Sequence, residues 1–366
     1  MRILWINHRD IKHPEAGGAE VRQYEIAKQL VKAGHRVSLL CERVAGMPAR
    51  EKLDGVEIVR LGNKYLVHLI IPLYVLRHYR EFDVIIDDVA HAVPWYSPLV
   101  TKTPVIAQIH HVHQAVLDVE FPAFASWPIK QLERSVAKVY RNFITVSRST
   151  KMELIRTFGI HPKRIAVVPN GVDLEKYKPG IKESKPTVLW VGRVKKYKRL
   201  DHLLEAFKIV KKKIPESQLV VIGHGENLYD AFKYAKKLEL NDVWFLGKVD
   251  DKKKIYWMQR AWIIVSTSMV EGWGLVVTEA AACRTPAVAY RVPGVSDSII
   301  DGLTGLLVPP GDIRELAEAI IRLLRDDDYR DYLGENALKR AQNYGWNFIS
   351  KEFERSVVNF LYEENT

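Results

Sequence analysis

Two glutamates, Glu271 and Glu279, bracket the stretch EGWGLVVTEA, which is otherwise small, aromatic or apolar. Gly272 and Gly274 loosen a loop after a strand-like run, and Glu279 falls about one turn inside a predicted helix. Carboxylate oxygens accept hydrogen bonds from hydroxyl groups, so the pair suits recognition of a sugar or a ribose. An exposed surface pair is the alternative, but the apolar neighbours of Glu279 would make an unpartnered charge costly.

Two cations stand at another predicted strand end. Arg193 follows the run TVLWVG, and Lys198 comes just before the next predicted helix. Arginine can hold a diphosphate through its planar fork and lysine as a compact charge. Because both residues lie at a strand end rather than on a helix face, they indicate an anion site, whereas Lys195 and Lys196 are expected in solvent.

A glycine pair, Gly17 and Gly18, connects the first predicted strand to the first predicted helix within HPEAGGAE. Glycines let a backbone approach a ligand closely, and a helix amino terminus offers unpaired NH groups to an anion. A tight strand-to-helix turn without a ligand is the alternative. The pair is not the GxGxxG pattern of dinucleotide binding, which argues against a nicotinamide enzyme.

The net charge of +11 is concentrated between residues 121 and 170, where nine basic residues face two acidic ones. Four of the basic residues recur at helical spacing within one predicted amphipathic helix, which is preceded by the aromatic residues Phe121, Phe124 and Trp127. The four are Lys130, Arg134, Lys138 and Arg141. This helix is either a solvated face or a surface for anionic lipid or a phosphate-bearing acceptor. No nucleic-acid-binding motif accompanies it.

Strand-like and helix-like runs alternate along the chain, which is typical of parallel sheets covered by helices. The alternation restarts after a polar stretch at 174–186, and 366 residues suit two domains. We therefore predict an α/β protein with two Rossmann-like, doubly wound parallel sheets facing a cleft, with ligands at the carboxyl ends of the strands. The expected strands are 2–7, 35–41, 83–88, 104–110, 142–147 and 164–170, then 187–192, 218–223, 243–247, 262–267 and 286–290.

The predicted domains are 1–173 and 187–342, with a linker at 174–186 and a terminal helix at 343–366 that returns to the first domain. The longest apolar run, 65–76, is too short to span a bilayer and is expected to be a buried helix. No secretory signal is recognised, and the two cysteines lie in different halves. A cytoplasmic protein, peripheral on the inner face of a membrane if the basic helix binds lipid, is expected.

Three histidines in IHHVHQ, at 110, 111 and 113, invite a zinc interpretation. Alternate residues leaving a strand seldom converge on one ion, and no carboxylate or cysteine stands at ligand spacing. We therefore expect no metal site.

In combination, these stretches resemble the family 4 glycosyltransferases, which have the GT-B fold of two Rossmann-like domains. The resemblance covers nearly the whole chain, through GGAE, ITVSRSTKMEL, VVPNGVD, VGRVKKYKRLDHLLEAF, EGWGLVVTEA and DGLTGLLVPPGD. It implies transfer of a sugar from a nucleotide-diphosphate donor of GDP-mannose or UDP-glucose type to a hydroxyl of a lipid-linked or glycan acceptor. It also implies retention of anomeric configuration and no required metal or other cofactor.

The resemblance assigns roles to individual residues. Arg193 and Lys198 match the pair that holds the donor diphosphate and stabilises its departure. Glu279 matches the glutamate that binds ribose, and Glu271 the one that contacts the donor sugar; a covalent nucleophile is conceivable, but reaction on one face through an oxocarbenium-like state is favoured. The remaining matches are the amides of Trp273, Gly274 and Leu275 beside Gly272, and His110 next to the transferred sugar. Gly17 and Gly18 match the amino-terminal loop that approaches the donor diphosphate and the acceptor.

The chain departs from the family pattern at three places, with Arg284 for a glycine, Trp273 for a phenylalanine and Asp297 for a glutamate. None is a diphosphate or glutamate position, so they bear on sugar choice rather than on activity. Two other functions share the fold: a sugar-nucleotide-binding protein without catalysis, and a sugar-nucleotide epimerase.

Overall fold

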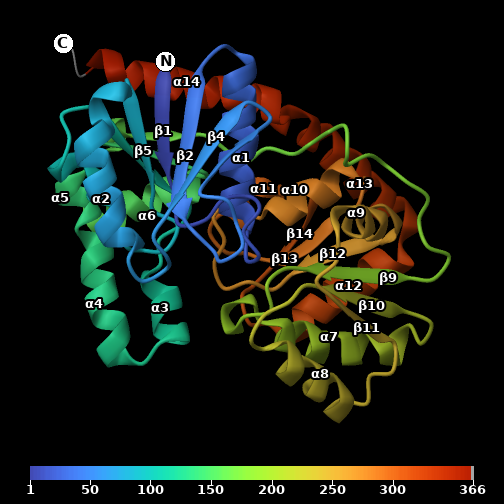
Figure 1. The fold of residues 1–366 in the computed structure, drawn as a ribbon. Coiled ribbons are helices and arrows are strands. Elements are labelled where there is room, and N and C mark those ends of the chain that lie inside the picture. The colour runs from blue at the N-terminus through green and yellow to red at the C-terminus, as the bar shows by residue number, and fades with distance from the viewer. Residues whose placement is uncertain (364–366) are drawn as a thin grey trace. The chain divides into compact units, whose positions relative to one another are not determined.

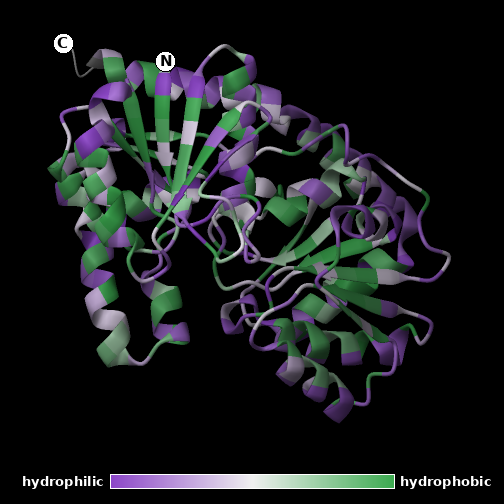
Figure 2. Ribbon diagram, in the orientation of Figure 1, coloured by the Kyte–Doolittle hydropathy of each residue, from purple (hydrophilic) through white to green (hydrophobic). Residues whose placement is uncertain are grey.

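The structure is a computed structural model that describes residues 1–363, and the chain divides into two compact units. The first unit contains Met1–Asn170 together with the terminal segment that begins at Trp346, and the second contains Gly171–Gly345. Each unit is built on one sheet, and Figure 2 shows both sheets in the green of hydrophobic residues. The predicted α/β class with two doubly wound sheets is confirmed.

The sheet of the first unit has eight strands in the order β3-β4-β2-β1-β5-β6-β7-β8 (Figure 1). All neighbouring pairs are parallel except β3 with β4. The strands are β1 (Arg2–Ile6), β2 (Arg36–Glu42), β3 (Arg50–Leu53), β4 (Val56–Leu61), β5 (Val84–Asp88), β6 (Val105–Ile109), β7 (Asn142–Thr145) and β8 (Ile165–Val167). The order reverses between β1 and β5, so the loops after these strands lie beside one another.

The hairpin of β3 and β4 is absent from the sequence-based prediction. Its turn residues Asp54 and Gly55 both have positive φ, 48° and 84°. Asp-Gly favours this two-residue turn because both central residues must adopt left-handed backbone angles. The dipeptide Asp54-Gly55 therefore indicates the hairpin from the sequence alone.

Helices cover both faces of the first sheet. The side chains of α2 (Val67–His78), α5 (Val136–Val139) and α6 (Arg148–Phe158) share one core with the same face of the strands. On the other face lie α1 (Gly18–Lys32) and the terminal helix α14 (Trp346–Glu363), which pack together. The remaining helices, α3 (Gln114–Glu120) and α4 (Ala123–Arg134), lead into α5.

The terminal helix is held to the first sheet by an aromatic stack. The ring of Phe353 lies 4.7 Å from that of Trp5, nearly parallel to it, and both side chains are fully buried. His35 adds a contact of 2.9 Å to Glu354. The predicted terminal helix at 343–366 begins in the structure at Trp346, and residues 364–366 lie outside the described residues.

The sheet of the second unit has six parallel strands in the order β11-β10-β9-β12-β13-β14. They are β9 (Thr187–Val191), β10 (Gln218–Ile222), β11 (Val243–Gly247), β12 (Ile263–Ser266), β13 (Ala287–Tyr290) and β14 (Gly305–Val308). Its helices are α7 (Leu200–Lys213), α8 (Leu228–Lys237), α9 (Asp251–Arg260), α10 (Leu275–Ala282), α11 (Val295–Ser298), α12 (Ile313–Arg325) and α13 (Asp327–Ala341). Here the order reverses between β9 and β12, the strands that precede Arg193 and Glu271.

The stretch 174–186, expected to be a linker, belongs to the second unit. Tyr177 is buried in the core of that unit, and Glu183 accepts a hydrogen bond of 2.6 Å from Arg260 of α9. Secondary structure is nearly absent from the stretch, yet its side chains are part of the fold.

Replacing Phe353 by alanine is expected to lower the free energy of unfolding of the first unit by about 3–5 kcal/mol, because a fully buried ring is removed and its stack on Trp5 is lost. Urea unfolding followed by near-ultraviolet circular dichroism measures the change. Phe348→Ala on the same helix, where the ring is 54% exposed, is the control and should change stability by less than about 1 kcal/mol. Equal losses in the two variants would contradict the stacking argument.

Candidate functional site

The loop after β9 carries Arg193 and Lys198 and is held by the loop after β10. Val194 donates its backbone N–H to the carbonyl oxygen of His224 at 2.8 Å. A Cβ atom at Gly223 would lie 1.8 Å from the carbonyl oxygen of Gly192, so only glycine permits this approach. Lys198 then ends a short 3-10 turn, Lys196–Lys198, directly before α7. The cations are thus presented by two interlocked loops at the carboxyl end of the sheet.

Lys198 and Glu271 form an ion pair, although they were predicted from separate stretches. The Lys198 ammonium donates to Glu271 Oε1, and the hydroxyl of Ser268 donates to the same oxygen at 2.7 Å. Thr267 Oγ1 donates to the backbone carbonyl oxygen of Lys198 at 2.8 Å. Because β9 and β12 are neighbours, their following loops meet here.

The charge on Lys198 is stabilised by its partner. Burial acts to lower the pKa of the Lys198 ammonium, but the charge and hydrogen bond of Glu271, together with the charge of Tyr197, outweigh burial and raise that pKa above its usual value. The positive charge of Arg193 acts in the opposite direction, which indicates that the two cations are near each other. Within residues 1–363 the Arg193 guanidinium has no ion-pair partner, so it remains available to an anion.

The loop that begins at Glu271 is positioned by a second close backbone approach. A Cβ atom at Gly294 would lie 2.1 Å from the carbonyl oxygen of Glu271 and 2.6 Å from that of Gly272. Gly294 also has φ of 81°, in the left-handed region. Gly274, at φ 83°, is the residue before α10, and the helix begins at Leu275. The amides at the start of α10 therefore occupy a fixed position.

Trp273 is anchored in the second unit. Its side chain is buried, its indole N–H donates to Thr278 Oγ1 at 2.9 Å, and its ring lies 5.1 Å from that of Tyr344. The side chain thus serves to hold the loop, while its backbone amide, with those of Gly274 and Leu275, stays free of intrahelical partners, as at any helix start.

Glu279 has partners that no motif identified. The residue is 5% exposed, and its Oε1 accepts from the Tyr177 hydroxyl at 2.8 Å. The Lys254 ammonium lies 3.1 Å from Oε1 and 3.3 Å from Oε2. Burial and the Glu279 charge raise the pKa of Tyr177 far above its usual value, so its hydroxyl is a permanent donor. The sequence analysis indicated that burying the Glu279 charge without a partner would be costly. The contacts with Tyr177 and Lys254 offset that cost.

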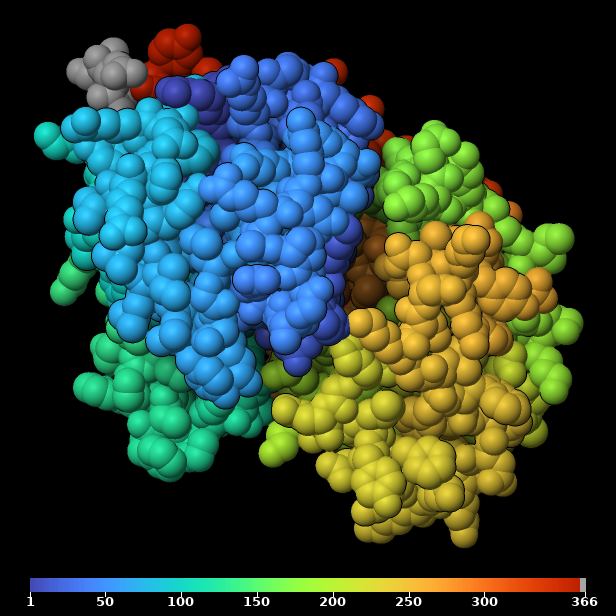
Figure 3. Space-filling view, in the orientation of Figure 1, coloured from blue at the N-terminus to red at the C-terminus, as the bar shows by residue number. Residues whose placement is uncertain are grey.

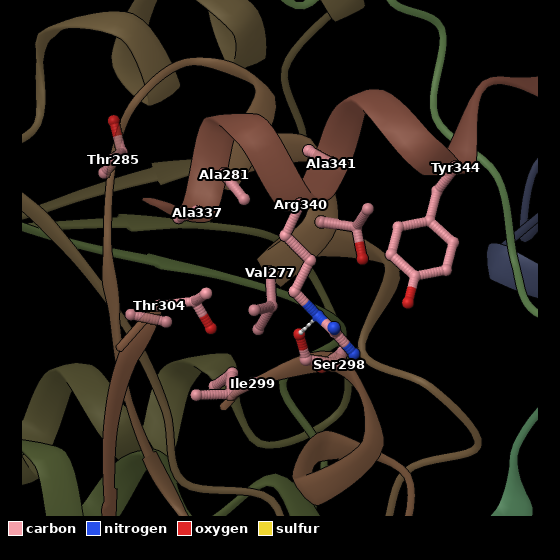
Figure 4. Close-up of a pocket in the computed structure, with 12 residues that line it drawn as sticks. Val277, Ala281, Thr285, Ser298, Ile299, Thr304, Ala337, Arg340, Ala341 and Tyr344 are labelled. Atoms are coloured by element: carbon pink, nitrogen blue, oxygen red, sulfur yellow. Dashed lines mark hydrogen bonds between the residues drawn. The ribbon is translucent and has the colours of Figure 1, made fainter. Parts of the chain in front are cut away.

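Figure 4 shows a cavity on another side of α10, lined by Val277, Ala281 and residues of α13. Arg340 crosses it to donate to the carbonyl oxygen of Ser298 at 3.1 Å. The volume of this cavity, about 10 Å³, is close to what one water molecule needs. It is too small for a sugar or a nucleotide.

In the first unit, His110 follows β6 and is nearly buried. Its Nε2 atom lies 2.8 Å from Oδ1 of Asp88, the last residue of β5. The other carboxylate oxygen of Asp88 is buried and has no hydrogen-bond partner among residues 1–363. The neighbouring strand ends thus hold the histidine in one orientation through an aspartate that the sequence-based prediction did not include.

Gly17 and Gly18 lie where α1 begins, but their backbone is ordinary. Gly17 has φ of −137°, an extended conformation open to any residue, and its N–H donates to the Glu20 carboxylate at 2.7 Å. The helix starts at Gly18, one residue earlier than predicted. The Gly17 amide is therefore used by the helix cap rather than free.

The predicted basic helix is two helices in the structure. α4 ends at Arg134 and α5 follows after Ser135, so Lys138 lies on α5 and Arg141 after it. Lys130 is paired with Asp118, whereas Arg134, Lys138 and Arg141 are exposed. The prediction of one continuous amphipathic helix is wrong, because Ser135 separates the segments and Tyr140 leaves the helix to enter the core.

Among residues 1–363 no three histidine, cysteine, aspartate or glutamate side chains are placed to hold a metal ion. Over the same residues, no helix has the length and apolarity needed to cross a membrane. Arg284, which departs from the family pattern, adopts φ of 60° where a glycine would be unstrained, and it pairs with Glu335 at 2.7 Å.

Two family models match adjoining parts of the chain. The model described as Glycosyltransferase Family 4 matches residues 16–176, and the one described as Glycosyl transferases group 1 matches residues 172–340. Together they include every site residue that was predicted from the sequence.

Curated relatives are similar over most of the chain. A D-inositol 3-phosphate glycosyltransferase of Kribbella flavida is 30% identical over 278 residues, which are 70% of this chain and 64% of that protein. The protein of the same description from Frankia alni is 29% identical over 393 residues, 95% of each chain. An N-acetyl-alpha-D-glucosaminyl L-malate synthase of Bacillus anthracis is 27% identical over 365 residues, 89% of each.

Solved structures share the fold. Sucrose-phosphate synthase from Thermosynechococcus elongatus superposes with a TM-score of 0.84 at 22% identity and covers 99% of both chains. HepE of Anabaena, in complex with UDP-glucose, gives 0.78 at 20% identity over 98% of this chain and 100% of its own. The fold is therefore GT-B.

Replacing Gly294 by alanine is expected to displace the 271–274 loop, since the added methyl group overlaps the backbone at Glu271. The amides of Val277 and Thr278, which donate to Gly274, should then exchange hydrogen at least about tenfold faster. Gly311→Ala is the matched control, because Gly311 has φ of 84° but nothing within 4 Å of the new methyl. If both variants change the exchange of these amides alike, general backbone strain rather than loop displacement is the cause.

Proposed function

This chain belongs to the family 4 glycosyltransferases, and we propose that it moves a hexose from a nucleotide-diphosphate sugar to a hydroxyl group of a lipid-linked or glycan acceptor, with retention of configuration. The observation that carries the proposal is the cluster of Lys198, Glu271 and Ser268 beside Arg193, where the strand order of the second sheet reverses. Ligands of open α/β sheets bind at such points.

Arg193 and Lys198 hold the donor diphosphate in this proposal. When the bond between the sugar C1 and the diphosphate oxygen breaks, negative charge grows on the leaving diphosphate, and two fixed cations stabilise it without reorganising. In the structure the Lys198 ammonium is paired with the Glu271 carboxylate. On donor binding Lys198 turns toward phosphate, and the Glu271 carboxylate becomes able to accept from a sugar hydroxyl. The amides of Gly272, Trp273, Gly274 and Leu275 face the sugar and phosphates.

Retention is proposed to follow from reaction on one face. The acceptor hydroxyl adds to C1 on the side that the diphosphate leaves, through an oxocarbenium-like state, and its proton passes to the departing diphosphate oxygen. Glu271 is bound to Lys198 and Ser268, which suits a carboxylate that contacts the sugar rather than one that attacks it. The two cations supply the charge stabilisation for which other enzymes use a metal ion, so none is required in the proposal.

Glu279 is proposed to bind the ribose of the donor. A carboxylate offers about four acceptor positions. Tyr177 and Lys254 occupy three of them, two on Oε1 and one on Oε2. The remaining position on Oε2 suits one ribose hydroxyl, and Tyr177 and Lys254 orient the carboxylate for it. The donor is of GDP-mannose or UDP-glucose type.

The first unit is proposed to bind the acceptor, with 1–173 as the acceptor domain and 187–342 as the donor domain. His110, oriented by Asp88, lies beside the transferred sugar, and the loop with Gly17 and Gly18 approaches the diphosphate and acceptor. The exposed residues Arg134, Lys138 and Arg141, with Lys130, form the surface for an anionic membrane or phosphate-bearing acceptor. The enzyme then works in the cytoplasm, peripheral on the membrane.

A small anionic acceptor is a second candidate. The names of the relatives from Kribbella flavida and Bacillus anthracis refer to inositol 3-phosphate and to malate, both anions with hydroxyl groups. A catalytically silent binding protein and an epimerase are less favoured, because Glu271, Glu279, Arg193 and Lys198 are all present. Release of nucleoside diphosphate from a donor panel, with a lipid phosphate, inositol phosphate or malate as acceptor, separates these functions.

Lys198→Ala and Glu271→Ala are each expected to lower kcat by about a hundredfold or more, since each removes a group from the transition-state surroundings. Acceptor-dependent release of nucleoside diphosphate is the measurement. Lys196→Ala, which removes an exposed lysine of the same turn, should leave kcat within about twofold. Unchanged turnover in the first two variants would refute the site assignment.

Tyr177→Phe is expected to raise the KM for the donor about three- to tenfold with kcat nearly unchanged, because Glu279 loses one orienting hydrogen bond while the ring still fills its place. Steady-state kinetics with varied donor gives both constants. Tyr290→Phe is the control, since its buried hydroxyl bonds His202 at 2.8 Å in the same unit. A fall in kcat without a change in KM would disagree with a ribose role for Glu279.

A further inference from the structure

Helix α2 is apolar on two opposite faces. Val67, Ile71 and Val75 are fully buried in the core of the first unit. The sequence-based expectation that the whole run 65–76 is buried is wrong, because a row of four leucines lies on the outside of the helix. The row consists of Leu66, Leu69, Leu73 and Leu76, exposed by 47, 67, 54 and 51%.

The leucine row is continuous along the helix. Its spacings of three and four residues place all four side chains on one face, opposite the buried side chains of Val67, Ile71 and Val75. Tyr65 extends the row and is 78% exposed. Figure 3 shows the sky-blue segment that contains α2 at the outer surface of the first unit. Single exposed leucines are ordinary, but a contiguous row marks a surface that meets another apolar phase.

The charges around the row are positive. Lys64 precedes it, with its ammonium 4.8 Å from the centroid of the Tyr65 ring, and Arg77 and Arg80 follow it, all three exposed. No acidic residue lies within Val67–His78, and Glu81 is bonded to His78 at 2.7 Å. An apolar stripe with cations at both ends suits a partner that is apolar within and anionic at its surface.

A second helix of the same unit repeats this combination. Phe124 and Trp127 of α4 are 82 and 65% exposed, and Arg134 follows them at helical spacing. α4 leads into α5, whose Val136 shares the core that α2 covers. Tyrosine and tryptophan beside basic residues are typical of segments at a lipid–water interface.

A second copy of the chain fits the row less well. A symmetric pair of α2 helices would bring Lys64, Arg77 and Arg80 of one copy near the same cations of the other, and like charges across an interface are costly. Anionic lipid head groups meet these cations favourably, at about 1 kcal/mol for each basic residue near the surface.

We propose that the leucine row of α2 inserts into the head-group boundary of an anionic bilayer, with Lys64, Arg77 and Arg80 at the lipid phosphates. The inference rests on the proposed membrane-associated function and deepens it: it assigns insertion to α2, while Arg134 and Lys138 add electrostatic attraction. The buried face of α2 stays in the protein core while the leucines enter the lipid. A helix that lies in the interface in this way needs no membrane span.

Cosedimentation with vesicles tests the proposal. The lipid is phosphatidylcholine with about a third phosphatidylglycerol, and phosphatidylcholine alone serves as the uncharged reference. Leu69→Ser with Leu73→Ser should lower the partition coefficient on the anionic vesicles about tenfold or more. Leu99→Ser with Phe348→Ser is the matched control, since these side chains of the same unit are 70 and 54% exposed. The control should bind as the unchanged protein does.

Two further measurements separate the alternatives. Arg134→Glu with Lys138→Glu should weaken binding mainly at low salt, where attraction to the anionic surface is least screened. If that variant loses binding while the leucine variant keeps it, the α2 inference is overturned and only the basic surface remains. If sedimentation velocity shows a dimer that the leucine variant abolishes, the row is a contact between copies and the proposal fails. Donor turnover on a soluble acceptor, measured on each variant, tells loss of membrane binding from loss of the proposed enzyme activity.

Discussion

The ion pair of Lys198 and Glu271 joins the two loops on which the proposed donor site depends. Lys198 lies in the loop after β9, and Glu271 lies in the loop after β12. The two strands are neighbours because the strand order of the second sheet reverses between them. A buried ammonium without this carboxylate would be driven toward its neutral form. The pair thus keeps a cation ready at the strand ends and fixes the loop that leads into α10.

Backbone packing supplies the precision that the pair alone cannot. Gly223 lets the loop after β10 press on Gly192, and Gly294 lets the loop after β13 press on Glu271. Four loops from four strands therefore support one another at the carboxyl edge of the sheet. The charged groups are on side chains, but the positions of the loops that carry them depend on close backbone contacts that only glycine allows.

The first unit uses similar means for a different surface. Neighbouring strands place Asp88 beside His110, and the stack of Phe353 on Trp5 holds the terminal helix against the opposite face of the sheet. On the outside of the same unit, α2 and α4 carry exposed apolar side chains next to basic residues. The exposed leucines are not part of the core, to which α2 contributes Val67, Ile71 and Val75.

The sequence by itself determined the fold class, the parallel strands and the residue types of the candidate site, because hydrophobic periodicity and strand-end motifs are local signals. It could also have revealed the β3–β4 hairpin through Asp54 and Gly55. Only the tertiary structure decided that Tyr177 and Lys254 hold Glu279, that Asp88 holds His110, and that the basic segment breaks at Ser135. These partners are far apart in the sequence and follow no spacing rule. The tertiary structure also showed which apolar residues of α2 are buried and which are exposed. The sequence does not show this, because the same apolar residue types occur in the core and on the surface.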